Sequence, residues 1–360
     1  MLASDVAFHP LWLPVAGLLL GGLFGALLRV TGFCAMGGVS DVVLMGDGRR
    51  LRAWLLATAV AIAGVQGAIG LGLLPPERLA TSSDILSLSG PIAGGLLFGI
   101  GMVFAGGCAS RNLVRTGGGD GRALAVVVAL GAVAWLVSVG PFESLRTALV
   151  VAWQIELPWA SDRLGDVVSQ LGGLSQDSGR MWAAIMVAGL IGGWCLVSPD
   201  FRRSARHLGS GIGVGLLVAA GFVVTGAAYD EMALSPTPPT SLTFVRPVAD
   251  TLTWLGAGGG DWPGFGIAIV VGTWLGAFLV AVGNRSFRPQ GFAGRGDVLR
   301  SLTGAALMGL GGTAALGCTI GQGVTGMATL AIGSIVTLVS LVVGGVVGLV
   351  LLERWVDLDS

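Results

Sequence analysis

The stretch from residue 90 to residue 108, GPIAGGLLFGIGMVFAGGC, is apolar and glycine-rich throughout and ends at Cys108. An uncharged apolar segment of nearly 20 residues is long enough to cross the hydrocarbon core of a bilayer as a helix. Its last residues, Gly106 and Gly107, allow the backbone to bend, which a membrane helix tolerates where protein surrounds it. The stretch therefore predicts a membrane-spanning helix that breaks at Cys108.

The rest of the chain has the same character. Apolar residues make up 53% and charged residues 11% of the 360 residues, whereas an average soluble domain has roughly 25% charged residues. This composition argues against a soluble enzyme and a disordered protein, and the net charge of zero argues against nucleic-acid binding. We therefore expect an all-α polytopic membrane protein that is not an enzyme and has no nucleic-acid partner.

Nine segments are predicted to span the membrane, some of them short enough to be partly re-entrant. They cover residues 12–33, 53–74, 90–108, 123–141, 181–198, 208–228, 264–283, 301–318 and 328–352. Alternate loops hold most of the arginines, which favour the cytoplasmic side. These are Arg49, Arg50, Arg52, Arg111, Arg115, Arg122, Arg202, Arg203, Arg206, Arg285, Arg288, Arg295 and Arg300, against Arg78, Arg146, Arg163, Arg180 and Arg246 in the other loops. The alternation predicts an outer N-terminus and a cytoplasmic C-terminus.

A glycine precedes three of the four cysteines by nine residues, which indicates an internal repeat. The pairs are Gly25 and Cys34, Gly99 and Cys108, and Gly309 and Cys318, while a weaker copy at residues 211–225 has no cysteine. The predicted topology inverts the later copies relative to the earlier ones. We therefore expect one transport domain over residues 1–360, with inverted repeats at 10–142 and 205–352 and a connector at 143–204 that holds one span.

The shared position of Cys34, Cys108 and Cys318 favours a function over simple packing, whereas Cys195 lies outside the repeat and is interpreted as packing. A soft-metal site and a redox dithiol stay open as alternatives. The spacing lacks a CxxC pair, and no base lies beside Cys108 or Cys318. Neutral thiols in apolar, glycine-lined bends can instead donate S–H hydrogen bonds to a soft anion. Helix N-termini nearby favour an anion as well.

These residues resemble the YeeE/YedE family of bacterial inner-membrane sulfur transporters. The matching stretches are residues 29–38 (RVTGFCAMGG), 105–110 (AGGCAS), 115–119 (RTGGG), 241–247 (SLTFVRP) and 317–323 (GCTIGQG). The resemblance covers most of the chain and implies an hourglass-shaped permease whose motif cysteines pass thiosulfate along by S–H hydrogen bonds. By position these are Cys34, Cys108 and Cys318, with Cys108 as the central binder.

The resemblance also implies a location in the bacterial cytoplasmic membrane and a possible cytoplasmic sulfur carrier similar to TusA. The alternatives are a permease for another sulfur or selenium compound and a membrane thiol sensor or enzyme. We expect no cofactor and no bound metal, and the chain has no ATPase motif. The roles of the long loops at 142–180 and 229–263 stay open. The predicted substrate site comprises Cys34, Gly107, Cys108, Arg246, Gly317, Cys318, Gly321 and Gln322.

Overall fold

The computed structural model describes residues 12–76, 79, 85–157, 161–229, 238–259 and 263–359, which form a helical bundle with one two-stranded sheet. The first half contains α1 (Trp12–Thr31), α2 (Ala35–Met45), α3 (Arg49–Gly70), β1 (Ile85–Ser87), η2 (Gly90–Gly94), α4 (Gly95–Phe104), α5 (Ala109–Gly117), α6 (Gly121–Ser138), α7 (Glu143–Val151), β2 (Gln154–Glu156) and α8 (Leu164–Gly172). The second half contains α9 (Gln176–Val197), α10 (Pro199–Arg203), α11 (Ala205–Ala227), α12 (Val245–Gly256), α13 (Phe265–Gly283), α14 (Arg295–Ala314), η3 (Gly321–Gly326) and α15 (Ile332–Asp359).

The prediction of an all-α polytopic membrane protein is confirmed. Within the described residues, eight helical segments are long and apolar enough to cross a membrane. Most of the remaining predicted span, residues 301–318, lies in α14, which begins at Arg295 and ends at Ala314, while residues 315–318 lie in the break that follows. The first turns of α14 contain Arg295, Asp297 and Arg300, and this charge keeps α14 out of the set of eight.

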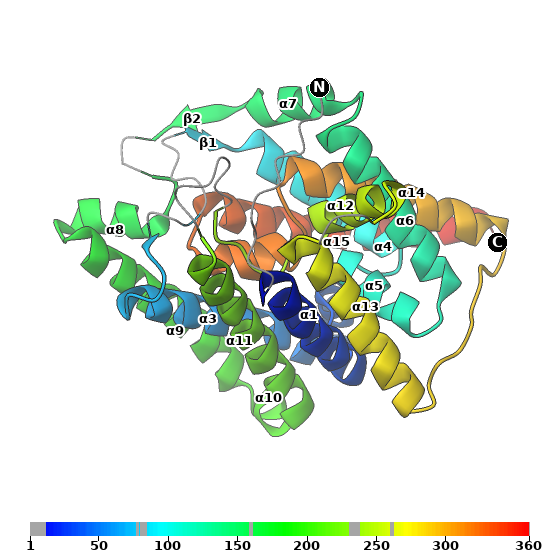
Figure 1. The fold of residues 1–360 in the computed structure, drawn as a ribbon, viewed down its shortest axis with the longest axis horizontal. Coiled ribbons are helices and arrows are strands. Elements are labelled where there is room, and N and C mark those ends of the chain that lie inside the picture. Colours follow the sequence, from blue (N-terminus) through cyan, green and yellow to red (C-terminus); the bar gives the residue numbers. More distant parts are fainter. Residues whose placement is uncertain are drawn as a thin grey trace.

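The long helices pack side by side through glycines. Figure 1 shows their ribbons crossing in a compact bundle, with α1 beside α13 and α3 beside α11. The glycine that precedes each repeat cysteine by nine residues lies at such a crossing, and so does Gly215 of the weaker copy. A side chain there would meet a backbone oxygen of the neighbouring helix: Gly25 faces Thr273, Gly99 faces Leu341, Gly309 faces Leu130 and Gly215 faces Ala57. The glycines therefore set the distance between helices.

Three helices break at the cysteines. Residues 32–34 separate α1 from α2, residues 105–108 separate α4 from α5, and residues 315–320 separate α14 from η3. Glycines or an unusual leucine in the left-handed region make the bends: φ is 69° at Gly32, 70° at Gly106 and 57° at Leu316. Short helical segments follow each break, as the sequence predicts.

The structure describes residues 142–157 and 161–180 of the region 142–180. It contains α7, β2 and α8, and β2 pairs antiparallel with β1. Figure 1 shows α7 and this strand pair at the end opposite α10. Arg163 donates to the carbonyl oxygens of Pro76 and Leu79, which ties the region to the loop after α3. Arg78, one of the arginines used to predict orientation, lies outside the described residues.

Candidate functional site

The three repeat cysteines occupy equivalent places at the starts of short helices. Cys34 is the N-cap residue of α2 and Cys108 is the N-cap residue of α5, while Cys318 lies just before η3. All three are buried, with side-chain exposures of 8%, 2% and 0%. Each is a free thiol.

The sulfur of two of these residues accepts a backbone hydrogen bond three residues along the chain. Gly37 N–H donates to Cys34 Sγ at 3.4 Å, and Gly321 N–H donates to Cys318 Sγ at 3.3 Å. A capping sulfur acts as acceptor, so its own S–H proton stays available for another partner. Backbone capping therefore holds these thiols in place without using their donors.

The breaks also bring the thiols toward one another, although they are distant in the sequence. Cys34 and Cys108 interact directly, and the charge of Arg111 acts on Cys34. Cys318 lies within electrostatic range of Cys108. The described residues hold no group of three or more His, Cys, Asp and Glu side chains arranged to bind a metal ion. The sulfurs thus form a series with Cys108 in the middle.

Hydroxyl groups accompany the central thiol. Ser110 Oγ lies 3.4 Å from Cys108 Sγ, and the Thr319 hydroxyl interacts with the same sulfur. Thr319 Oγ1 is buried and has no partner at normal hydrogen-bond geometry among the described residues. A buried hydroxyl without a full partner is costly, so Thr319 is suited to bind a guest beside Cys108. Sequence reasoning quoted both hydroxyl residues in the motifs but did not single them out; their position next to cysteines was the available signal.

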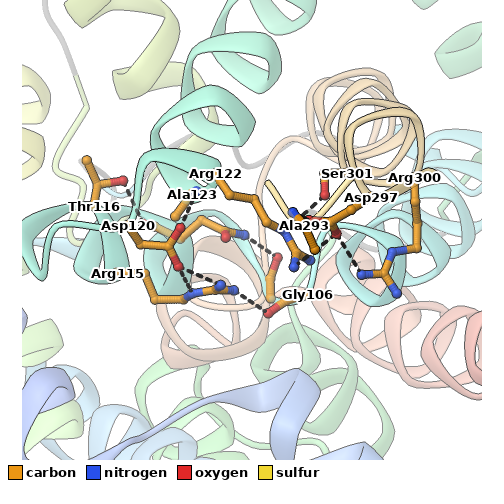
Figure 2. Close-up of polar contacts among 12 residues, drawn as sticks. Gly106, Arg115, Thr116, Asp120, Arg122, Ala123, Ala293, Asp297, Arg300 and Ser301 are labelled. Atoms are coloured by element: carbon orange, nitrogen blue, oxygen red, sulfur yellow. Dashed lines mark hydrogen bonds and ion pairs between the residues drawn. The ribbon is translucent and has the colours of Figure 1, made fainter. Parts of the chain in front are cut away.

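Polar side chains stabilise the backbone of the break around Cys108 by hydrogen bonds to its carbonyl oxygens. Asn112 Nδ2 donates to Gly107 O at 2.7 Å and to Cys108 O at 3.2 Å. Arg115 donates to Gly106 O at 3.2 Å and pairs with Asp120 at 2.6 Å. Figure 2 shows this cluster beside a second one, in which Asp297 pairs with Arg122 and Arg300. Gly107 itself has φ of 154°, a conformation that a side chain would strain.

The turn before Cys318 is held by Gln322. Its Nε2 donates to Ala315 O at 2.9 Å and to Leu316 O at 3.2 Å, and its Oε1 accepts from the Ser334 hydroxyl at 2.5 Å. Gln322 therefore stabilises the turn through these hydrogen bonds. The absence of a side chain at Gly317 leaves room for the Gln322 side chain, since a Cβ there would lie 2.9 Å from Gln322 Cγ.

Gly321 keeps the space between Thr243 and Cys318 open. A Cβ on Gly321 would lie 2.6 Å from Thr243 Oγ1 and 3.7 Å from Cys318 Sγ. Thr243 also lines a cavity of about 260 Å³ together with Gly317 and Arg246. The structure thus connects the predicted residue Arg246 to the cysteines through Thr243, which sequence reasoning quoted only as part of the 241–247 stretch.

Four arginines lie in or directly beside the matching stretches, namely Arg29, Arg111, Arg115 and Arg246, and two of them form ion pairs. Arg115 pairs with Asp120 and Arg246 pairs with Asp250 at 2.9 Å. Arg29 donates to the backbone and side-chain oxygens of Ser286. No ion pair of Arg29 or Arg111 is found within the described part of the chain, and the charge of Arg111 acts on Cys34.

Cys195 belongs to the packing between helices. It is fully buried in α9, and its thiol donates to Arg52 O at 3.4 Å. No interaction joins it to the series Cys34, Cys108 and Cys318 in the described residues.

A bundle of apolar helices that breaks at buried thiols is the architecture of a membrane transport protein. Residues 30–347 match the model of a family described as sulphur transport, and the chain belongs to this family. Two relatives carry the name thiosulfate transporter TsuA. The one from Escherichia coli K12 is 26% identical over 355 residues, covering 92% of each chain. The one from Spirochaeta thermophila is 28% identical over 334 residues, covering 88% of this chain and 92% of the relative.

A third relative is the probable transporter YedE of Escherichia coli K12. It is 28% identical over 193 residues, which cover 52% of this chain and 42% of the relative.

Proposed function

We propose that this protein carries thiosulfate across the cytoplasmic membrane of a bacterium, into the cell. The family and the full-length similarity to two proteins named thiosulfate transporter support the substrate. The observation that carries the mechanism is the buried series of thiols at three helix breaks, with Cys108 between Cys34 and Cys318.

In this mechanism each thiol donates an S–H hydrogen bond to the anion and passes it to the next. Such donors are weak, so no single position holds the anion tightly enough to prevent its release. The N-terminal ends of α2 and α5 add the partial positive charge of their unpaired N–H groups. The anion moves from Cys318 to Cys108, where Ser110 and Thr319 assist, and then to Cys34 and toward Arg111.

The chain is built, on this proposal, from two inverted repeats at 10–142 and 205–352. The packing of the helices supports it, because the partners are reciprocal. Helix α1 packs on α13 as α11 packs on α3, and α4 packs on α15 as α14 packs on α6. Two halves related by a pseudo-twofold axis produce such reciprocal pairs and place their breaks near one common centre.

The orientation is part of the proposal. Arginines hold helix ends together on one side of the bundle: Arg206 in the first turn of α11 donates to Val30 O near the end of α1, and Arg29 of α1 donates to Ser286 in the loop after α13. This side faces the cytoplasm, and α7 with the strand pair faces outward. A TusA-like sulfur carrier on the cytoplasmic side stays a prediction from the family resemblance.

Uptake of radioactive thiosulfate into cells that lack other thiosulfate permeases tests the mechanism. Cys108→Ala is expected to reduce uptake at least a hundredfold, because it removes the central donor. Cys195→Ala is the matched control, since this buried cysteine lies apart from the series, and it is expected to retain most of the uptake. Both variants are compared at equal amounts of the protein in the cell membrane.

Full uptake by Cys108→Ala would refute the thiol mechanism. A reversible disulfide between Cys34 and Cys108, detected by counting thiols before and after oxidation, together with no uptake by the unmodified protein, would favour the redox alternative. Transport of another sulfur or selenium anion in preference to thiosulfate would change the substrate and leave the site in place.

A further inference from the structure

The cavity of about 260 Å³ beside Cys318 contains an arginine that none of the motifs includes. Its walls come from the end of α6, from α7, from the start of α12 and from the end of α14. The polar residues that line it are Ser138, Arg146, Thr243, Arg246 and Thr313.

Arg146 forms no ion pair with the residues that the structure describes. Its Nε is buried and has no hydrogen-bond partner, and no carboxylate of the described residues forms an ion pair with it. Buried donors normally have partners, and leaving one unpaired is costly. Arg246, which also lines the cavity, pairs with Asp250 at 2.9 Å, and its side chain is 63% exposed. The cavity therefore carries excess positive charge.

Two of the residues that line the cavity lie next to the residues around Cys318. Gly317 lies directly before Cys318 in the chain, and Thr243 lies against Gly321, whose backbone N–H caps the Cys318 sulfur. An anion held between the two arginines would thus be next to the first thiol of the series.

We propose that this cavity is a capture site in which Arg146 and Arg246 hold a divalent sulfur oxyanion before it reaches Cys318. The proposal rests on the transport function proposed above. It gives the region 142–180 a role, because α7 supplies Arg146. Two guanidinium groups at a partly enclosed surface raise the local concentration of an anion, and salt screens the effect.

Chemical labelling tests the charge of the cavity without relying on transport. A thiol is introduced by Ser138→Cys, and the purified full-length protein is held in nanodiscs of uncharged lipid. Each reagent's rate is divided by its rate with a free thiol in solution, and on this scale an anionic methanethiosulfonate is expected to react about tenfold faster with the introduced thiol than a cationic one of similar size. The parent protein corrects for the native cysteines, which are all buried.

Sulfate serves as the probe for binding, because it is a divalent sulfur oxyanion that does not consume the reagent. Sulfate is expected to slow the labelling more than chloride does at equal ionic strength. Adding Arg146→Gln is expected to remove this protection and most of the preference for the anionic reagent. The control is Arg180→Gln, which removes an arginine that is paired with Asp177 on α9 and does not line the cavity.

Equal rates for the two reagents, each divided by its rate with a free thiol, would overturn the proposal, and so would protection by sulfate that survives Arg146→Gln. Protection that depends on Arg146 in a protein that fails to take up thiosulfate would support the anion site and refute the transport function. The two proposals therefore fail separately.

Discussion

Arg115 connects the backbone of one helix break to a buried carboxylate. Its guanidinium donates to Gly106 O and pairs with Asp120, whose side chain is 10% exposed and also caps α6 through Ala123 N–H. A buried carboxylate without a cation is far more costly than one with a partner. The residue thus couples the position of the 105–108 bend to the stability of the turn between α5 and α6 (Figure 2).

Arg115→Gln is expected to lower the free energy of unfolding by about 3 kcal/mol, because it leaves the Asp120 carboxylate unpaired. The double variant Arg115→Gln with Asp120→Asn should recover most of this loss, since asparagine is neutral and still caps a helix. Thermal unfolding in detergent, followed by tryptophan fluorescence, measures both variants. An equal fall in the single and the double variant would show that Arg115 acts through Gly106 and not through the ion pair.

At the scale of single residues, the sequence located the thiols correctly at the breaks but did not show which charges are neutralised. Arg115 and Arg246 look like free cations in the sequence, and both are paired. Whether an arginine forms an ion pair depends on the three-dimensional positions of the two side chains, which the sequence does not show. Arg146 shows the reverse case, because nothing in its surroundings in the sequence marks it as unpaired.

Among the helices, the recurring glycine nine residues before each cysteine is explained by close packing. The crossing of α1 and α13 is the tightest example, because the position of a Cβ on Gly25 overlaps the carbonyl group of Thr273. Neighbouring Gly22 differs, since a Cβ there would lie 3.8 Å from Gly272 O, which is ordinary contact. Helix α1 therefore contains one glycine at which a methyl group would clash, Gly25, and one at which it would fit, Gly22.

Gly25→Ala is expected to lower the melting temperature by several degrees, because overpacking at a helix crossing costs typically 1–3 kcal/mol. Gly22→Ala should leave it unchanged or raise it slightly, since alanine favours helix over glycine. A thermal shift assay in detergent compares the two with the unmodified protein. If both substitutions act alike, the close contact of α1 with α13 is not what the repeated glycine serves.

For the whole molecule, the two ends of the bundle can be assigned to the two sides of the membrane. The end with α10 carries Arg202 and Arg203, whereas the opposite end carries α7 and the strand pair (Figure 1). Because arginine-rich loops stay in the cytoplasm, we expect α7 to be accessible from outside an intact cell.

Labelling with a membrane-impermeant maleimide checks this orientation. Leu145→Cys on α7 should react in intact cells, and Asp200→Cys on α10 should react only after the cells are broken; both side chains are exposed. The reverse pattern would invert the topology and exchange the inner and outer ends of the proposed path.

Hydropathy, glycine spacing and the positions of the cysteines are local properties of the chain, and from these the sequence alone determined that the protein is a membrane helix bundle with breaks at Cys34, Cys108 and Cys318. Each span is predictable because its backbone hydrogen bonds close within the segment itself. The recurring spacing also singled out these glycines, although it could not show which helix each of them contacts.

Only the tertiary structure decided which helices cross and in what order the thiols meet. Cys108 and Cys318 are 210 residues apart, and the placement of Thr319 beside Cys108 depends on the packing of α14 against α4. The cavity shared by Arg146, Thr243 and Arg246 also requires residues from three separate segments. Such neighbours arise because side chains from distant segments fit together, and this fit has no signature within any one segment.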